Sequence, residues 1–211
     1  MKVNTAAILS IAILSACSAA ADGDRAWISK IRRDHPRMFF NADTWPAVKA
    51  RLSESQYAKE HYERMVKACD GYPDNPVCDG FGPVTTPPTT PIPPIRDWGG
   101  EAARCAFVWR ATGERKYLEK AKAMLLSSVA AYGEAFKNRR AVHWYSSRRI
   151  LALCAYDWIH EALTDDERRA IIVPFVRYIE DIQPGPGRPF IVRRNKGDYI
   201  SGFYGVPSLL W

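Results

Sequence analysis

The chain has 211 residues, and 47% of them are hydrophobic, which is enough apolar material for a folded domain with a buried core. This composition excludes an intrinsically disordered protein. The formal net charge of +7 weakly favours anionic partners, although a basic surface that binds nothing would give the same charge.

The N-terminus has the layout of a secretory signal. Lys2 precedes an apolar run at residues 6–14, which is too short to cross a bilayer as a helix. An ordinary signal peptide of this kind would be cut near Ala20 or Ala21.

Residues 14–17, Leu-Ser-Ala-Cys, resemble the lipobox of bacterial lipoproteins. We therefore expect residues 1–16 to be removed as a signal peptide, Cys17 to be lipidated, and residues 17–34 to form a tether. Ser18 after the lipidated cysteine favours the outer membrane, facing the periplasm or the cell surface. A membrane partner is thus expected through the lipid anchor.

Residues 35–211 are expected to form one helical domain. An extended lead-in from His35 comes first, followed by helices at about 44–52 and 55–68. The segment 71–96 is then a long proline-rich loop, because proline cannot continue a helix. A loop of this length is usually functional or a disordered insertion.

The first of two helical hairpins follows this loop. Asp97 is expected to cap a helix that runs to residue 112 and ends at Gly113, a residue that favours the left-handed stop. The returning helix, 114–132, carries an apolar stripe on one face.

The second hairpin repeats this design about fifty residues later. Residues 146–162 are apolar on every face, which is typical of a buried helix. Thr164 and Glu167 form a capping box, and the helix after it is apolar on one side, with Pro174 expected to kink it.

The repeated hairpins predict an all-α fold, an incomplete α/α toroid of antiparallel helix pairs. A toroid needs more pairs than these to close. We therefore expect the chain to be truncated before closure, as the N-terminal portion of a longer protein.

The cysteines suggest one disulfide. Cys69 and Cys78 flank a turn-rich stretch, and an exported protein meets an oxidising compartment. Cys105 and Cys154 lie in apolar helices and are expected to be small buried residues. No spacing typical of a zinc site occurs, so no metal is predicted.

Aromatic and basic residues gather just before the second buried helix: His143, Trp144, Tyr145, Arg148 and Arg149. Aromatic rings stack on sugars, and arginine pairs with carboxylates, so these residues are candidate substrate-binding groups. Alternatively, the aromatic residues pack the corner and the arginines face water.

Three polar residues are interpreted as structural. Asp157 lies within the buried helix and is expected to be hydrogen bonded, with a role as a glycosidase acid as the alternative. His35 is expected to be structural, and His160 to interact with the helix dipole.

Three segments resemble the heparinase II/III-like polysaccharide lyases, which include alginate lyases. They are residues 35–40, His-Pro-Arg-Met-Phe-Phe; residues 111–121, beginning Ala-Thr-Gly; and residues 155–168, beginning Ala-Tyr-Asp-Trp. The resemblance covers about residues 35–211. It implies an incomplete α/α toroid followed by a large β domain.

The resemblance also implies a chemistry. A uronate in an acidic polysaccharide or oligosaccharide loses its C5 proton, and the glycosidic bond at C4 breaks by β-elimination. In such lyases an Asn or His neutralises the carboxylate, which makes Asn195 the candidate, with Arg193, Arg194 and Lys196 as substrate-binding neighbours. A catalytic Tyr and His are expected beyond Trp211.

Two other functions stay open. One is a glycoside hydrolase on an α/α barrel, and the other is a non-catalytic glycan-binding surface lipoprotein. No cofactor is predicted, although a structural metal in the absent β domain stays open, and nucleic acid is not expected as a partner.

Overall fold

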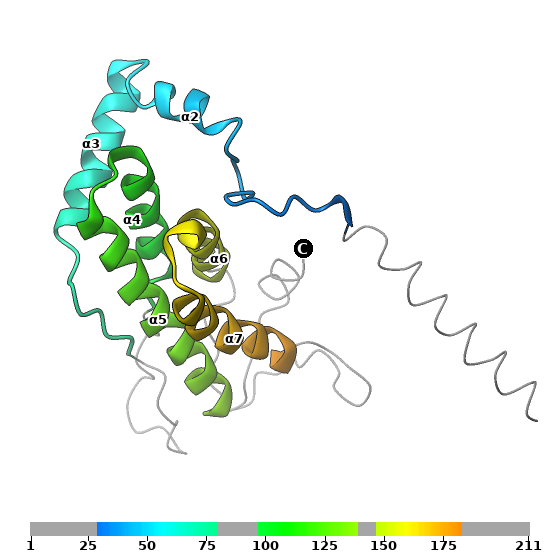
Figure 1. The fold of residues 1–211 in the computed structure, drawn as a ribbon. Helices are drawn as coiled ribbons and strands as arrows, with labels where there is room; N and C mark the ends of the chain where they lie inside the picture. The colour runs from blue at the N-terminus through cyan, green and yellow to red at the C-terminus, as the bar shows by residue number, and fades with distance from the viewer. Residues whose placement is uncertain (1–28, 80–96, 139–146, 183–211) are drawn as a thin grey trace, which may run out of the picture. The chain divides into compact units, whose positions relative to one another are not determined.

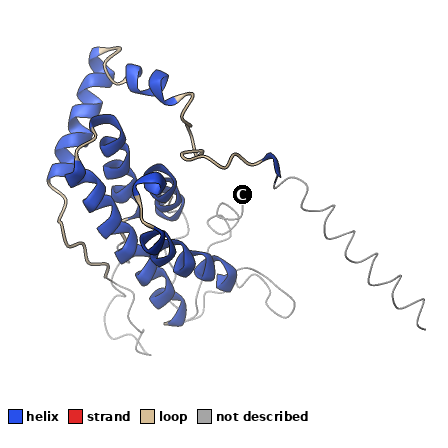
Figure 2. Ribbon diagram, in the orientation of Figure 1, coloured by secondary structure: helices blue, strands red, loops and turns tan. Residues whose placement is uncertain are grey.

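The computed structural model describes residues 29–79, 97–138 and 147–182 (Figure 1). Helices and loops make up this described part, without a strand, which confirms the all-α class there (Figure 2). The chain divides into two units, Met1–Asp34 and His35–Trp211. In the first unit Arg32 and Asp34 form an ion pair with an Nη2–Oδ2 distance of 2.6 Å. The helices below belong to the second unit.

The described helices match those expected from the sequence, and α5 extends beyond its predicted end. In chain order they are α2 (Trp45–Arg51), α3 (Gln56–Asp70), α4 (Gly99–Thr112), α5 (Arg115–Lys137), α6 (Arg148–Ile159), a 3₁₀ turn (His160–Ala162) and α7 (Asp165–Ile182).

Both hairpins turn as the sequence predicts. Gly113 has a φ of 75°, and its N–H donates to the carbonyl of Trp109 at 2.6 Å, which ends α4. At the second corner the Thr164 N–H donates to Glu167 Oε2 at 2.8 Å, and the Glu167 N–H donates to Thr164 Oγ1 at 3.2 Å. The capping box is therefore confirmed, and α7 continues through Pro174.

Helices α4 and α6 lie side by side and run in the same direction. At their N-terminal ends a Cβ added to Gly99 would overlap the carbonyl oxygen of Arg148 and would lie 3.1 Å from the Cβ of Ala152. Near their C-terminal ends Arg110 Nη2 lies 3.9 Å from Glu161 Oε2. The two backbones approach closely because the facing positions are glycine and alanine.

Helices α5 and α7 pack on each other and run antiparallel to α4 and α6. Near their N-terminal ends Lys122 Nζ donates to Glu167 Oε1 at 2.8 Å. Near their C-terminal ends the rings of Tyr132 and Tyr178 stack with centroids 5.3 Å apart. The described part therefore holds two antiparallel helix pairs in two layers.

The two helices of the second hairpin, α6 and α7, differ in which of their faces are buried. In α6 the buried positions occur all around the helix, whereas α7 buries one stripe and leaves Val173 and Val176 exposed. This difference confirms that the first helix is buried and that the second is half-exposed. The stripe of α7 consists of Ile171, Phe175 and Tyr178.

A buried lysine closes the C-terminus of α3. Lys120 of α5 donates from Nζ to the carbonyls of Cys69, Asp70 and Tyr72 at 3.1, 3.0 and 2.6 Å. An ammonium has three donors, and the last carbonyls of a helix lack intrahelical partners. One side chain thereby satisfies three acceptors and holds α3 to α5.

The lead-in segment binds the carboxylate of Asp157 on α6. Oδ2 accepts the N–H groups of Arg37 and Met38, each at 2.8 Å, and Oδ1 lies 2.6 Å from His35 Nδ1. Trp158 Nε1 donates to the Met38 carbonyl at 2.9 Å. Asp157 is therefore a hydrogen-bonded structural carboxylate, as expected.

The same contacts define the tautomer of His35. Its Nε2 lies 3.1 Å from Arg37 Nη2, and because a guanidinium has only donors, Nε2 accepts and Nδ1 carries the proton that Asp157 binds. The His35 ring also stacks on His160 with centroids 3.7 Å apart. Burial and the neighbouring His35 lower the pKa of His160, which disfavours the protonated ring that the expected interaction with the helix dipole requires.

We predict that Gly99→Ala lowers the free energy of unfolding by about 1–3 kcal/mol, because the new methyl group overpacks the contact with Arg148. Gly133→Ala is the matched control, since nothing lies within 4 Å of the added Cβ. This control should raise stability by about 0.5–1 kcal/mol through helix propensity. Urea unfolding of both variants measures the difference, and equal stabilities would contradict the close approach of α4 and α6.

We predict that Asp157→Asn destabilises the fold by about 2–4 kcal/mol, because an amide offers one oxygen to three donors and adds an N–H₂ that faces them. The exposed Asp165→Asn serves as the control and should change stability by less than about 1 kcal/mol. Thermal unfolding of the two variants checks this, and an unchanged melting temperature in Asp157→Asn would show that the lead-in does not depend on this carboxylate.

Candidate functional site

The two ends of the helix pairs differ in how the chain connects them. At one end lie the short corners at Gly113 and at 160–164. At the other end α4 and α6 begin and α5 and α7 end. In chain order, segment 80–96 precedes the start of α4, segment 139–146 lies between α5 and α6, and residues 183–211 follow α7. Binding residues in helical folds concentrate where long connections meet a rigid scaffold. This second end is therefore where a binding site is expected.

A buried guanidinium lies at this end. Arg149, the second residue of α6, has only 1% of its surface exposed, and its Nη1 donates to Tyr178 Oη at 3.1 Å. Its Nε and Nη2 have no hydrogen-bond acceptor among the described residues. Because buried polar groups are normally paired, two open donors on one charged side chain indicate a place for an acceptor.

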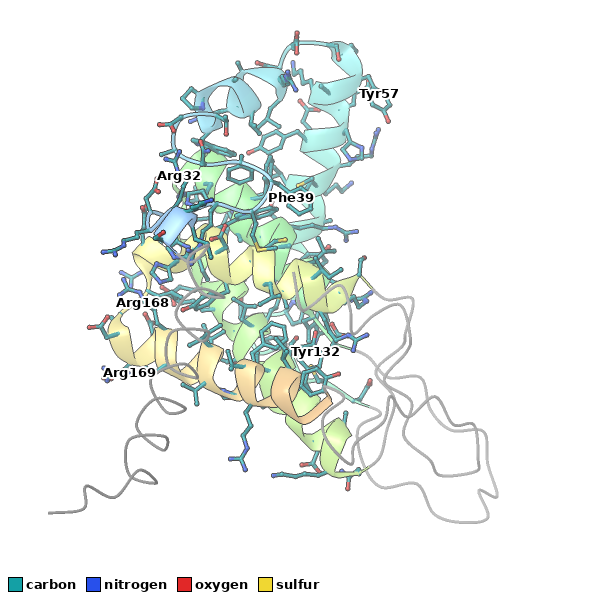
Figure 3. The ribbon with its side chains drawn as sticks, turned by 90° about the vertical axis from the view of Figure 1, so that its right-hand side faces the viewer. Arg32, Phe39, Tyr57, Tyr132, Arg168 and Arg169 are labelled. Atoms are coloured by element: carbon teal, nitrogen blue, oxygen red, sulfur yellow. The ribbon has the colours of Figure 1, made fainter. Side chains whose placement is uncertain are left out.

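Two phenols and a carboxylate support this arginine. Tyr132 of α5, labelled in Figure 3, stacks on Tyr178 and donates from Oη to Asp97 Oδ1 at 3.2 Å. Asp97 also accepts the Gly99 N–H at 3.0 Å. We call Asp97, Tyr132, Arg149 and Tyr178 the Arg149 cluster.

Burial governs the ionisation of this cluster. It raises the pKa of Asp97, against the opposing effects of the Gly99 N–H and the Arg148 charge. It also raises the pKa of Tyr132 well above the ordinary value, and the charge of Asp97 adds to the shift. Tyr132 therefore stays protonated, so this phenol can donate a hydrogen bond but is a poor base.

Arg148 is held by the protein itself. Its Nη1 donates to the Asp97 carbonyl at 2.8 Å and to Glu101 Oε2 at 2.6 Å, and the side chain is partly exposed. Glu101 on α4 therefore competes with the substrate carboxylate that Arg148 was expected to bind. In this structure Arg148 joins the starts of α4 and α6.

The other site residues expected from the sequence lie outside the described residues, and they stay predictions. They are His143, Trp144, Tyr145, Arg193, Arg194, Asn195 and Lys196, together with the lipidation candidate Cys17.

The cysteine pairing differs from the one expected. All four described cysteines are free, and the thiol of Cys69 hydrogen bonds with that of Cys105 on α4, which lowers the pKa of Cys69. Cys78 instead lies by Ser127 and Ser128, with its Sγ 3.3 Å from Ser127 Oγ. The thiols are thus free in this structure, and the Cys69–Cys78 disulfide of the exported chain stays a prediction.

Neither a metal site nor a membrane span is found among the described residues. Within residues 29–79, 97–138 and 147–182, no cluster of three or more His, Cys, Asp and Glu is placed to hold a metal ion. No described helix combines the length and the apolar character that crossing a bilayer requires.

No motif in the sequence pointed directly to the two phenols of the cluster. Tyr132 and Tyr178 continue the buried stripes of α5 and α7, three residues after Val129 and Phe175. Their place in these stripes indicates burial, and a buried phenol needs a polar partner. That rule could have pointed to a polar group at this end of the helices.

The chain was compared with family models, curated proteins and solved structures, and none of them matches.

We predict that mild oxidation of the folded chain links Cys69 to Cys105 and produces no Cys69–Cys78 link, because the first pair of thiols is already in contact. Peptide mapping without reduction identifies the pair. The Cys105→Ala variant is the control, and it should lose the cross-link. A Cys69–Cys78 peptide from the native chain would contradict the structure.

Proposed function

We propose that the chain is the N-terminal helical part of a polysaccharide lyase that cleaves a uronate-containing acidic glycan by β-elimination. The observation that carries the proposal is the buried guanidinium of Arg149, which offers two open donors at the end of the helix pairs where the long segments join. A uronate carries the planar carboxylate that such donors bind best.

The helix pairs fit the same proposal. Two antiparallel pairs pack with α4 beside α6 and α5 beside α7. This is the inner and outer arrangement from which an α/α toroid is built, and we propose that further pairs continue it. The resemblance of residues 35–40, 111–121 and 155–168 to heparinase II/III-like lyases adds to this support.

The proposed reaction is a β-elimination that begins with the loss of a proton and ends with the protonation of the leaving oxygen. A base removes the proton from C5 of the uronate, the electron pair forms a double bond between C4 and C5, and the C4–oxygen bond breaks. The leaving oxygen takes a proton from an acid. Negative charge develops on the carboxylate during this step, so a donor such as Asn195 stabilises the transition state.

Hydrolysis is less well supported by the inner helices. A glycoside hydrolase needs two carboxyl groups roughly 5–9.5 Å apart. Glu101 is bound by Arg148 at one end of α6, and Asp157 is bound by the lead-in about 13 Å farther along the helix at 1.5 Å per residue. Neither carboxylate is placed to work with the other.

Export and anchoring belong to the proposal as well. The lipobox-like residues 14–17 place lipidated Cys17 at the start of the mature protein, which would hold the domain at the outer membrane. A non-catalytic glycan-binding lipoprotein is the second candidate. The same Arg149 cluster supports it, because binding a carboxylate does not require chemistry.

We predict that the chain binds polygalacturonate or alginate more tightly than a neutral glucan, and that salt weakens the binding because exposed charges are screened within about 10 Å at 0.1 M. Affinity electrophoresis in gels that contain each polymer measures this. Equal retardation by the neutral glucan would contradict an acidic substrate.

In the protein that carries the complete site, elimination would appear as new ultraviolet absorbance from the unsaturated product. Asn195→Ala should then lower the rate by about 10²–10³-fold. Reducing sugar released without this absorbance would indicate hydrolysis. Full activity in Asn195→Ala would show that another group neutralises the carboxylate.

A further inference from the structure

The Arg149 side chain is a charged group without a complete set of partners. Only Nη1 is bonded, to Tyr178, while Nε and Nη2 are fully buried and unpaired within the described residues. An uncompensated buried charge strongly destabilises a protein. The other described side chain with an open buried nitrogen is Arg110, which has one such atom and lies near Glu161.

The two open nitrogens share one edge of the guanidinium. Its five N–H donors form a rigid planar fork, in which the Nε–H and one Nη2–H point the same way. This edge matches the two oxygens of a carboxylate, which can accept both hydrogen bonds in parallel. A ligand with a single acceptor oxygen would leave one donor unpaired.

The protein holds this edge in a fixed orientation. The bond from Nη1 to Tyr178 fixes the guanidinium, the stacking of Tyr178 on Tyr132 fixes the phenol, and Tyr132 is bonded to Asp97. The four residues come from the start of α4 and from α5, α6 and α7. A donor pair that is preorganised in this way binds with less loss of side-chain freedom.

The carboxylates near this edge already have partners. Asp97 accepts from Tyr132 Oη and from the Gly99 N–H, and Glu101 accepts from Arg148. The acceptor for Nε and Nη2 therefore comes from outside the described cluster.

We propose that the Nε–Nη2 edge of Arg149 binds the carboxylate of a uronate residue in the glycan. This inference rests on the proposed function and assigns the recognition of the sugar acid to one residue of the chain. Arg149 is thereby a binding residue, and Asn195 keeps the separate role of stabilising charge in the reaction. Because the guanidinium is enclosed, the protein must open locally for the ligand, so association is slower than diffusion.

The test follows the Arg149 Nε–H group by ¹⁵N–¹H NMR, with the signal assigned by its loss in Arg149→Lys. Addition of a tetragalacturonate should move this signal downfield, because the Nε–H then donates to a carboxylate. Arg149→Lys keeps the charge but loses the fork, so tetragalacturonate binding should weaken about 10- to 100-fold.

The matched control is Arg169→Lys on α7, an exposed arginine whose Nη1 lies 3.9 Å from Asp166 Oδ1 (Figure 3). This control should bind tetragalacturonate as the unaltered chain does. Tyr178→Phe provides a second variant that keeps Arg149 and removes only its anchor. It should weaken binding less than Arg149→Lys does.

The outcomes separate this inference from the proposed function. Tetragalacturonate binding that leaves the Arg149 signal unchanged overturns the inference. The lyase proposal then loses the support of Arg149 and depends on the helix pairs and on ultraviolet absorbance from the unsaturated product. Sulfate or formate shifting the signal while tetragalacturonate does not bind overturns both. A signal that is already downfield without ligand also overturns the inference, because the acceptor then belongs to the chain.

Discussion

The contact between α4 and α6 at Gly99 sets the geometry on which the rest of the helical unit depends. Because Gly99 has no side chain, the backbone of α4 reaches the first turn of α6 at Arg148. This contact places the starts of two parallel helices together, and the short corners then bring the ends of α5 and α7 to the same place. Four helix ends and their polar side chains thereby meet at one end of the unit.

The two ends of the helices use buried charge in different ways. At the end of the helices that carries the short corners, Asp157 has a full set of donors from the lead-in, which attaches residues 35–38 to α6. At the end where α4 and α6 begin, Arg149 keeps two donors open although it is equally buried. A buried ion that is left without partners strongly destabilises a fold, and we propose that the open donors of Arg149 are kept for binding. This contrast is the physical basis for assigning structure to one end and recognition to the other.

Local patterns made much of this fold predictable. The capping box at Thr164, the stop at Gly113 and the all-round burial of α6 depend on neighbouring residues, and all three are confirmed. Contacts between distant residues were not predictable in the same way. The bond from Arg149 to Tyr178 spans 29 residues, and that from Lys120 to Cys69 spans 51. The expected Cys69–Cys78 disulfide relied on nearness in sequence, whereas the direction of α3 places Cys69 against Cys105.

The central claim is that this end of the helix pairs recognises the carboxylate of a sugar acid. Titration calorimetry with tetragalacturonate and with the same tetrasaccharide after its carboxyl groups have been reduced to alcohols tests the claim most directly. The account predicts binding of the acid and at least a tenfold weaker affinity for the reduced sugar, because the charge-assisted hydrogen bonds are lost. Equal affinity for the two sugars would contradict it.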